Sequence, residues 1–323
     1  MGSNSKIEWC DHTFNPWMGC TKVSQGCANC YAEQLMDKRW NKVQWGRQGK
    51  RVKTSVANWW EPVRWNKQAE ELGIRYRVFC ASLADVFEYK DDQPELDVWR
   101  AELFALMLET PNLDWMVLTK RPENVRSMLR AAGEWWYQAA PTTYDVKLLR
   151  WVHHGEHFAP ENVWIGTSVE NQEQADSRIP ALLNIPAKVR FLSMEPLLRS
   201  VDLGLTMLDY PSYTEEDPGE PLSYPSKAGQ LINWVIVGGE SGPHARPMHP
   251  DWVRSVRDQC VEAGVKFFFK QWGEWAPCTH FAIDEGTERN KVHRFEDGLL
   301  MYRYGKKVAG RELDGQEWNE MPS

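Results

Sequence analysis

The sequence predicts an α/β fold in which a parallel sheet forms a full or partial (β/α) barrel. Short apolar runs recur along the chain, and a segment with helical periodicity follows most of them. Each run stops at polar residues, as barrel strands do where their carboxyl ends face a common site. The 323 residues, 42% of them hydrophobic, are enough for one large core with insertions.

Seven apolar runs are predicted as strands, and five periodic segments as the helices between them. The strands are expected at residues 6–9, 77–82, 115–119, 163–168, 189–193, 234–237 and 265–270. The helices are expected at residues 28–40, 93–108, 122–131, 172–184 and 250–263. Strands that alternate with helices form βαβ units and pair in parallel. An open doubly wound sheet is the alternative to a barrel.

The barrel is expected to span residues 6–275 as one domain. Inserted stretches without a place in the strand–helix alternation are expected at about 41–67, 133–160 and 205–231. Residues 276–323 are predicted as a small C-terminal β-hairpin appendage, because Asp-Gly turn signals lie on both sides of an apolar run at 299–304.

Composition excludes several classes of protein. No apolar run is long enough to span a bilayer, and no signal peptide is recognisable. Seven cysteines without a secretion signal favour a reducing compartment, so we expect a cytoplasmic protein with no membrane contact. The formal net charge of -7 argues against a general polyanion binder, so any nucleic-acid contact needs a local basic patch.

Three cysteines lie close together near the N-terminus in a C-x6-C-x2-C run: Cys20, Cys27 and Cys30. Four thiolates close a structural site, whereas three leave one metal position open for chemistry. The spacing therefore favours an iron–sulfur cluster with an open iron. A zinc site completed by Cys10 and His12 is the first alternative, and simple burial of the thiols is the second.

Polar residues at the predicted strand ends form the second part of the candidate site. Lys120, Glu195 and Lys270 are the candidate catalytic or anion-binding residues, because a barrel brings the ends of its strands to one mouth. The candidate cofactor-binding residues are Ser82, Thr167, Ser193, Gly238, Gly239 and Glu240. Glycines after a strand let a ligand approach the backbone closely. For any single serine, capping of the following helix is the alternative role.

A basic, tryptophan-rich segment between residues 38 and 60 is the candidate nucleic-acid interface. Cations hold phosphates and flat rings stack on unpaired bases. The residues predicted to bind nucleic acid are Arg47, Lys50, Arg51 and Lys53. A solvated basic loop whose tryptophans are buried in the core is the alternative.

Five segments keep a recognisable order along the chain: WMGCTKVSQGCANCYAE at 17–33, FLSMEPL at 191–197, WVIVGGESGP at 234–243, FFFKQWG at 267–273 and GKKVAGRELDG at 305–315. Together they resemble the phage Gp37/Gp68-like family. The resemblance implies a relation to the radical SAM enzymes, which have a partial (β/α)6 barrel, a [4Fe-4S] cluster and S-adenosylmethionine (SAM). It implies that Cys20, Cys27 and Cys30 are the cluster ligands.

Two departures from the usual radical SAM motif are visible. Six residues separate the first two cysteines instead of three, and Asn29 stands where an aromatic residue usually precedes the last cysteine. The longer loop bears on the geometry of the cofactor and leaves the number of cysteine ligands unchanged.

The resemblance implies a phage-encoded enzyme in the host cytoplasm that makes a 5′-deoxyadenosyl radical. Its expected partners are DNA and an external one-electron reductant, and its expected reaction is the modification or isomerisation of an amino-acid-modified thymidine in hypermodified phage DNA. A radical SAM enzyme on a peptide or small molecule is one alternative. A zinc-stabilised DNA-binding protein without catalysis is the other. The sequence makes no prediction of oligomeric state.

Overall fold

The computed structural model describes residues 5–139, 143–205, 209–210, 226–227, 231–277 and 291–322. The predicted excursion at 205–231 falls largely outside these residues. Within them, no helix is both long and apolar enough to cross a membrane.

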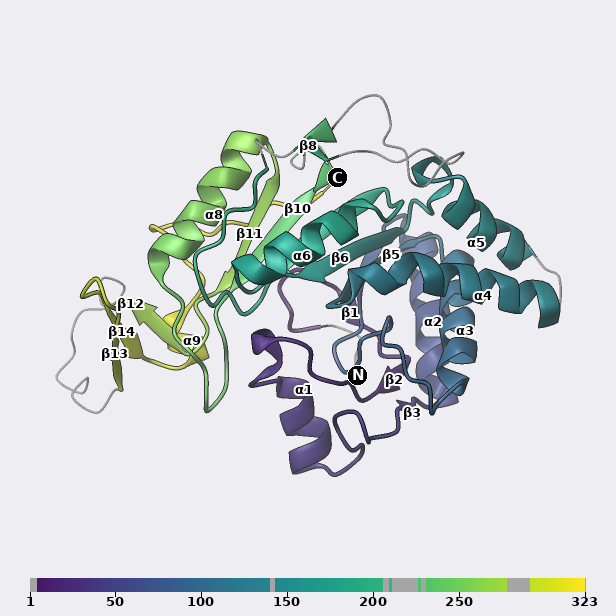
Figure 1. Ribbon diagram of the computed structural model, residues 1–323, viewed down its shortest axis with the longest axis horizontal. Helices are drawn as coiled ribbons and strands as arrows, with labels where there is room; N and C mark the ends of the chain where they lie inside the picture. Colours follow the sequence, from purple (N-terminus) through teal and green to yellow (C-terminus); the bar gives the residue numbers. More distant parts are fainter. Residues whose placement is uncertain are drawn as a thin grey trace.

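A seven-stranded parallel sheet organises the molecule (Figure 1). Its strands, in spatial order, are β1 (His12–Thr13), β4 (Tyr76–Cys80), β5 (Leu113–Thr119), β6 (Val163–Ser168), β7 (Val189–Met194), β10 (Trp234–Gly238) and β11 (Lys266–Gln271). Spatial order follows chain order without a reversal. A doubly wound sheet reverses its order at a switch point, so this alternative is excluded. The curled sheet is a partial barrel whose edges in the described residues are β1 and β11, which confirms the predicted fold class.

Helices cover the outer face of the sheet. They are α2 (Val56–Leu72), α3 (Glu95–Glu109), α4 (Val125–Ala139), α5 (Thr143–His153), α6 (Gln172–Leu183) and α8 (Pro250–Ala263). Short 3₁₀ turns are η1 (Gln25–Cys27), η3 (Pro122–Asn124) and η4 (Glu156–Phe158). After the cysteines, α1 (Tyr31–Glu33) runs directly into the π-helical segment η2 (Gln34–Arg39).

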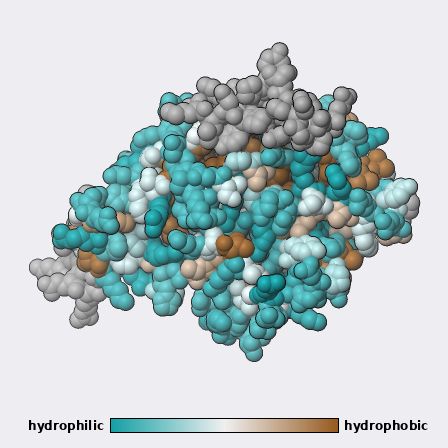
Figure 2. Space-filling view, viewed as in Figure 1, coloured by the Kyte–Doolittle hydropathy of each residue, from teal (hydrophilic) through white to brown (hydrophobic). Residues whose placement is uncertain are grey.

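The two faces of the sheet carry different parts of the core because side chains alternate along each strand. Val78, Val117 and Phe267 point to the large core under the helices. Phe79, Met116 and Phe268 belong to a smaller, aromatic cluster on the inner face. Away from the grey residues, the face of the molecule seen in Figure 2 is mostly hydrophilic.

Two sequence predictions at the N-terminal end are wrong. The first strand is at His12–Thr13 rather than at residues 6–9, which are bend and turn. The stretch predicted as an insertion at 41–67 contains most of helix α2, whose Trp65 is buried in the main core. The internal Pro62 obscures the helical pattern of α2 in the sequence.

The short strands β2 (Trp17–Met18) and β3 (Val52–Lys53) pair antiparallel beside the cysteine loop, and β8 (Asp209–Tyr210) pairs with β9 (Ser226–Lys227). The C-terminal appendage is a three-stranded antiparallel sheet rather than a hairpin. It consists of β12 (Trp275–Pro277), β14 (Leu300–Arg303) and β13 (Val292–Arg294), followed by helix α9 (Lys306–Ala309).

Candidate active site

The three cysteines of the predicted cluster line one cavity of about 260 Å³ at the carboxyl ends of the strands. The cavity joins side chains that lie far apart in the sequence. Those predicted as catalytic or cofactor-binding and found in its wall are Ser82, Lys120, Ser193, Glu195 and Lys270. The barrel therefore assembles the main part of the candidate site as the polar strand ends predict.

The cysteine loop is fixed by contacts from two distant strand ends. The backbone N–H of Gly26 donates to Glu170 Oε1 at 3.2 Å, and Glu170 in turn accepts from Arg178 at 3.0 Å. A Cβ atom at Gly26 would lie 3.0 Å from the Glu170 carboxyl carbon, so this close approach suits a glycine. Asn29 Nδ2 donates to Glu240 Oε2 at 3.0 Å from between the second and third cysteines.

A buried ionic network surrounds the first cysteine. Arg121 Nη1 lies 3.8 Å from Cys20 Sγ and 2.8 Å from Asp85 Oδ2, and its Nη2 donates to the carbonyl of Thr21 at 2.8 Å. Glu88, 3.6 Å from Arg121, receives two hydrogen bonds of 2.7 Å from Arg51. A guanidinium beside a sulfur stabilises the thiolate form that binds a metal.

Burial raises the pKa of the Cys20 thiol to about 12, and the nearby Asp85 and Glu88 add to the increase, while Arg121 opposes it. Burial also raises the pKa of Cys30. These two thiols therefore hold their protons at neutral pH in the metal-free protein. Metal binding would release those protons.

The residues proposed to complete a zinc site lie elsewhere. Cys10 packs in the inner aromatic cluster beside Ser5, and burial, the largest effect, raises its pKa to about 11. His12 stacks on Trp65 with ring centroids 4.3 Å apart. Among the described residues, no three His, Cys, Asp or Glu side chains are grouped as ligands of one metal ion. The described residues therefore do not support the alternative of a zinc site completed by Cys10 and His12.

The wall of the cavity carries a partly buried ion pair. Lys270 Nζ lies 2.9 Å from Glu195 Oε1 and 5.7 Å from the centre of the Trp9 ring. Burial alone would lower the pKa of Lys270, but the charge and hydrogen bond of Glu195 outweigh it, and the pKa is raised. Lys120 Nζ donates to Ser168 Oγ at 2.9 Å in the same cavity.

Four residues predicted to bind the cofactor are not in the cavity wall. Thr167 is fully buried and donates to the carbonyl of Thr119 at 2.9 Å. Gly239 is required by packing, because a Cβ atom there would lie 1.9 Å from the carbonyl oxygen of Trp272. A Cβ atom at Gly238 would meet the Glu195 carboxylate at 2.8 Å. These contacts explain the glycines through the approach of neighbouring chain segments.

Glu240 is the fourth of these residues, and its carboxylate is fully engaged by the protein. Arg246 donates to Oε1 at 2.7 Å and to Oε2 at 2.9 Å, and Asn29 also donates to Oε2. Burial, the largest effect, would raise the pKa of Glu240, but these hydrogen bonds lower it overall. Glu240 ties the cysteine loop to the segment after β10, which is a structural role that its sequence context did not indicate.

The predicted nucleic-acid residues separate into two groups. Arg47 and Lys50 are exposed. Arg51 is only 2% exposed and holds Glu88, Thr21 and two backbone carbonyls, so it is not available to a phosphate. Lys53 is paired with Glu102 and lies over the Trp59 ring. The prediction for Arg51 is therefore wrong, and Lys53 already has an ionic partner.

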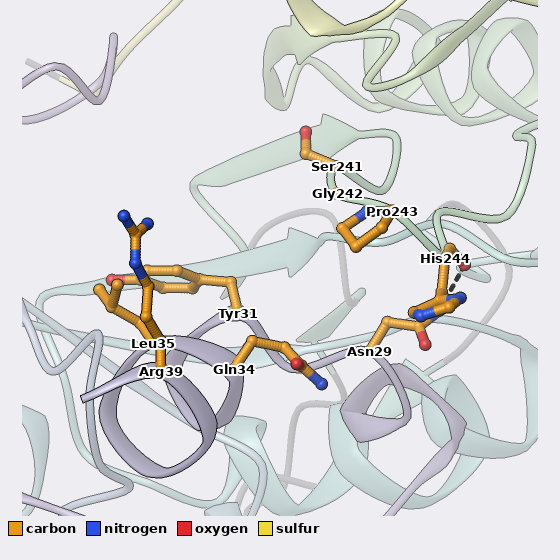
Figure 3. A pocket seen from close by; sticks show the side chains of 9 residues that line it. All are labelled: Asn29, Tyr31, Gln34, Leu35, Arg39, Ser241, Gly242, Pro243 and His244. Carbon is orange, nitrogen blue, oxygen red and sulfur yellow. Dashed lines mark hydrogen bonds between the residues drawn. The ribbon is translucent and has the colours of Figure 1, made fainter. Parts of the chain in front are cut away.

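A second pocket of about 210 Å³ adjoins the cavity (Figure 3). Tyr31 belongs to the walls of both. The pocket lies between the helical segment that follows Cys30 and the loop at residues 241–244 after β10. Sequence reasoning did not identify it, because its two walls are about 200 residues apart in the chain.

A family model described as "Protein of unknown function (DUF5131)" matches residues 4–322. Among solved structures, a cysteine-substituted variant of spore photoproduct lyase has a TM-score of 0.42 at 13% identity, over 93% of this chain and 70% of that chain. A tyrosine-substituted variant of the same protein has a TM-score of 0.39 at 10% identity with the same coverage. No curated protein matches the sequence.

Proposed function

The chain belongs to the DUF5131 family of proteins of unknown function, and we propose that it is a radical SAM enzyme. The observation that supports the proposal best is the arrangement of the three cysteines. Cys20, Cys27 and Cys30 come from one loop and line one cavity at the carboxyl ends of the strands. Three cysteine ligands leave one iron of a [4Fe-4S] cluster open, whereas a closed structural zinc site takes four ligands.

The donor set fits a [4Fe-4S] cluster with one open iron. Cys20, Cys27 and Cys30 would hold it, and Arg121 would donate toward the Cys20 sulfur. When bound with SAM, such a cluster supplies the electron that generates a carbon-centred radical able to abstract hydrogen. The remaining roles belong to the side chains of the cavity.

We assign the anion-binding role in the cavity to Lys120 and Lys270. Both cations lie in its wall, and one of them is already balanced by Glu195. Among the residues that the structure describes, Lys120 Nζ is paired only with a hydroxyl, so it has charge available for the carboxylate of SAM or for an anionic group of the substrate. Ser82 and Ser193 supply hydroxyls in the same wall. The buried network of Asp85 and Arg121 keeps the cysteine side of the cavity rigid.

The substrate that we propose is a modified thymidine in DNA, and the support for it is the exposure of Arg47 and Lys50 on the basic segment. A base in a duplex would have to be flipped out to reach the cavity. We further propose that the protein is encoded by a phage and acts in the cytoplasm of the host, which the description of the matching family does not mention. An external one-electron reductant is the second partner that we propose. A peptide or small-molecule substrate is the alternative, and a DNA-binding assay distinguishes it from a DNA substrate.

The test is anaerobic purification and iron reconstitution, followed by EPR of the dithionite-reduced protein with and without SAM. We expect a [4Fe-4S]⁺ signal that shifts when SAM is added. Replacing any one of Cys20, Cys27 and Cys30 by alanine should abolish the signal. Cys260→Ala should keep it, because Cys260 is a fully buried residue of helix α8 that packs in the main core. A protein that retains zinc and no iron after reconstitution would overturn the proposal.

A further inference from the structure

The pocket beside the cysteine cavity has one helical wall and one loop wall (Figure 3). Tyr31, Gln34, Leu35 and Arg39 line it from the helical segment, where they share a face through spacings of three and four residues. Pro243 and His244 line it from the loop after β10. The wall that includes Tyr31 starts at the residue next to Cys30, so a molecule in this pocket lies beside the candidate active site.

The helical wall has an unusual backbone. Residues Gln34–Arg39 form a π-helix, and the N–H of Trp40 reaches back to the carbonyl of Leu35. Wider π turns are rare, less favourable than α-helical turns, and frequent at functional sites. Here the π turn lies between Tyr31 and Arg39, so it sets where the guanidinium stands relative to the ring.

The charge of the pocket is positive. The two acids of this helical segment are used elsewhere, because Glu33 pairs with Lys22 at 2.6 Å and Asp37 accepts from the N–H of Trp45 at 2.7 Å. No acidic residue is in the described lining of the pocket. Arg39 is exposed and has no ion-pair or hydrogen-bond partner within the described part of the chain. The guanidinium is therefore available to an anion.

The apolar surfaces of the pocket suit a flat ring. Tyr31 is 57% exposed, and the Leu35 side chain and the Pro243 ring provide further apolar wall. The Gln34 amide and the His244 imidazole supply donors and acceptors around this surface. At about 210 Å³ the pocket is smaller than the roughly 300–1,000 Å³ of drug-sized ligand sites, so it accommodates one ring system with its substituent.

We propose that this pocket binds a nucleotide, with the base against Tyr31 and the phosphate at Arg39. A planar ring and an anion are the two features that its walls recognise together, and a nucleotide has both. The assignment rests on the proposed function, because it identifies the group next to the reacting base of the substrate. A free nucleotide and one nucleotide of a single strand both present this planar ring and this anion.

The test uses the full chain without a cluster, and isothermal titration calorimetry with thymidine 5′-monophosphate. Stacking of a base on an aromatic side chain corresponds to about a 5- to 150-fold change in affinity. We expect Tyr31→Ala and Arg39→Gln each to weaken binding at least about fivefold. Thymidine and inorganic phosphate should each bind more weakly than the nucleotide.

Matched controls are available on other surfaces. Tyr89→Ala removes a tyrosine that is 68% exposed, and Arg64→Gln removes an arginine side chain that is 70% exposed, both outside the pocket. They should leave the affinity unchanged. A trinucleotide of thymidylate that binds tighter than the mononucleotide, and still depends on Tyr31, identifies a strand as the source. Equal affinity identifies a free nucleotide.

Three results would overturn the assignment: no nucleotide binding at millimolar concentration, the same affinity in both pocket variants as in the wild type, or displacement of the nucleotide by SAM. None of these measurements needs iron. A protein that forms the SAM-responsive cluster and binds no nucleotide refutes this inference alone. A protein that binds the nucleotide through Tyr31 and forms no cluster refutes the proposed function alone.

Discussion

At the scale of single residues, Arg121 connects the cysteine loop to the barrel. Its side chain is about 9% exposed and contacts a sulfur, a carboxylate and a backbone carbonyl. Asp85, its main partner, also accepts from the hydroxyl of Thr119 and the N–H of Lys120. Since both Nη atoms of Arg121 and both carboxylate oxygens of Asp85 have partners, the arginine is held in one orientation beside Cys20.

Replacing Arg121 by glutamine should therefore change the cluster more than a comparable replacement elsewhere. Loss of a positive charge beside a ligand sulfur makes reduction of the cluster less favourable. We therefore expect its midpoint potential to fall by tens of millivolts; about 59 mV corresponds to a tenfold change in a one-electron equilibrium. The measurement is an EPR-monitored redox titration of the reconstituted protein.

Arg190→Gln is the matched control for this change. Arg190 is a buried arginine of β7 outside the cavity wall, where it pairs with Glu156 at 2.8 Å and donates to the carbonyl of Ile185. Both variants remove a buried guanidinium that is ion-paired and hydrogen-bonded, and both should lose about 1.5–3 kcal/mol of stability. Only Arg121→Gln should shift the potential, and an equal shift in both would refute the role of Arg121.

At the scale of elements, the cysteine loop is fixed by the segments that follow β6 and β10. Glu170 follows β6 and holds Gly26, and Glu240 follows β10 and holds Asn29. The loop has few regular hydrogen bonds of its own, so these two carboxylates, together with the contacts of Arg51 and Arg121 to Thr21, define its position. Such loops lose order before the rest of a domain when their contacts weaken.

The contact made by Glu240 should depend on pH. Its pKa is lowered below the ordinary value of 4.5 in the folded protein, so its contribution to stability is present above pH 4.5 and is lost as the pH falls through the lowered pKa. We expect the wild type to be more stable than Glu240→Gln by about 2 kcal/mol near pH 6, with the difference shrinking below pH 4.5. Urea unfolding at several pH values measures this difference.

Glu161→Gln is the control, because its side chain is 82% exposed and its ion pair is at the surface. The stability difference from the wild type should stay near zero at every pH. A difference for Glu240→Gln that does not change between pH 6 and pH 3 would contradict the role of this carboxylate.

The same scale shows which elements the sequence can predict. Helix α8 is predicted to the residue, because Pro250 opens it and Gly264 ends it in a left-handed conformation. Strand β6 is also predicted to the residue as a short apolar run. Helix α2 also has capping residues, Ser55 and a left-handed Gly73, but the internal Pro62 interrupts its helical pattern. Strand β1 has only two residues, too few for any pattern.

Some parts of the candidate site can be predicted from the sequence, and others cannot. The cysteines and the polar strand ends are visible in the sequence, because topology alone brings them to one mouth. The buried state of Arg51 and the use of Glu240 as a tether depend on partners more than 35 residues away, Glu88 and Asn29. Sequence pattern has no means of predicting such pairs.

At the scale of the whole molecule, the C-terminal tail spans the open side of the partial barrel. Asn319 forms a bridge with Phe268 on β11, and the N–H of Phe269 donates to the carbonyl of Trp318 at 3.0 Å. Further along, Met321 packs on the inner aromatic cluster and contacts Arg77 on β4. The tail thus covers the exposed edge of β11 and reaches toward the other end of the sheet.

Deleting residues 317–323 should therefore destabilise the barrel and promote association. The deletion uncovers the hydrogen-bonding edge of β11 and removes Trp318, which packs edge-on against Phe267 with centroids 5.7 Å apart. Trp318 is partly buried, so its loss should cost about 1.5–3 kcal/mol, and a bare strand edge pairs readily with another chain. We expect a loss of this size in urea unfolding and a concentration-dependent rise in mass by light scattering.

Deletion of residues 322–323 alone keeps these contacts and should behave as the wild type. A monomer of unchanged stability after the longer deletion would show that the seven-stranded sheet needs no cover at this edge.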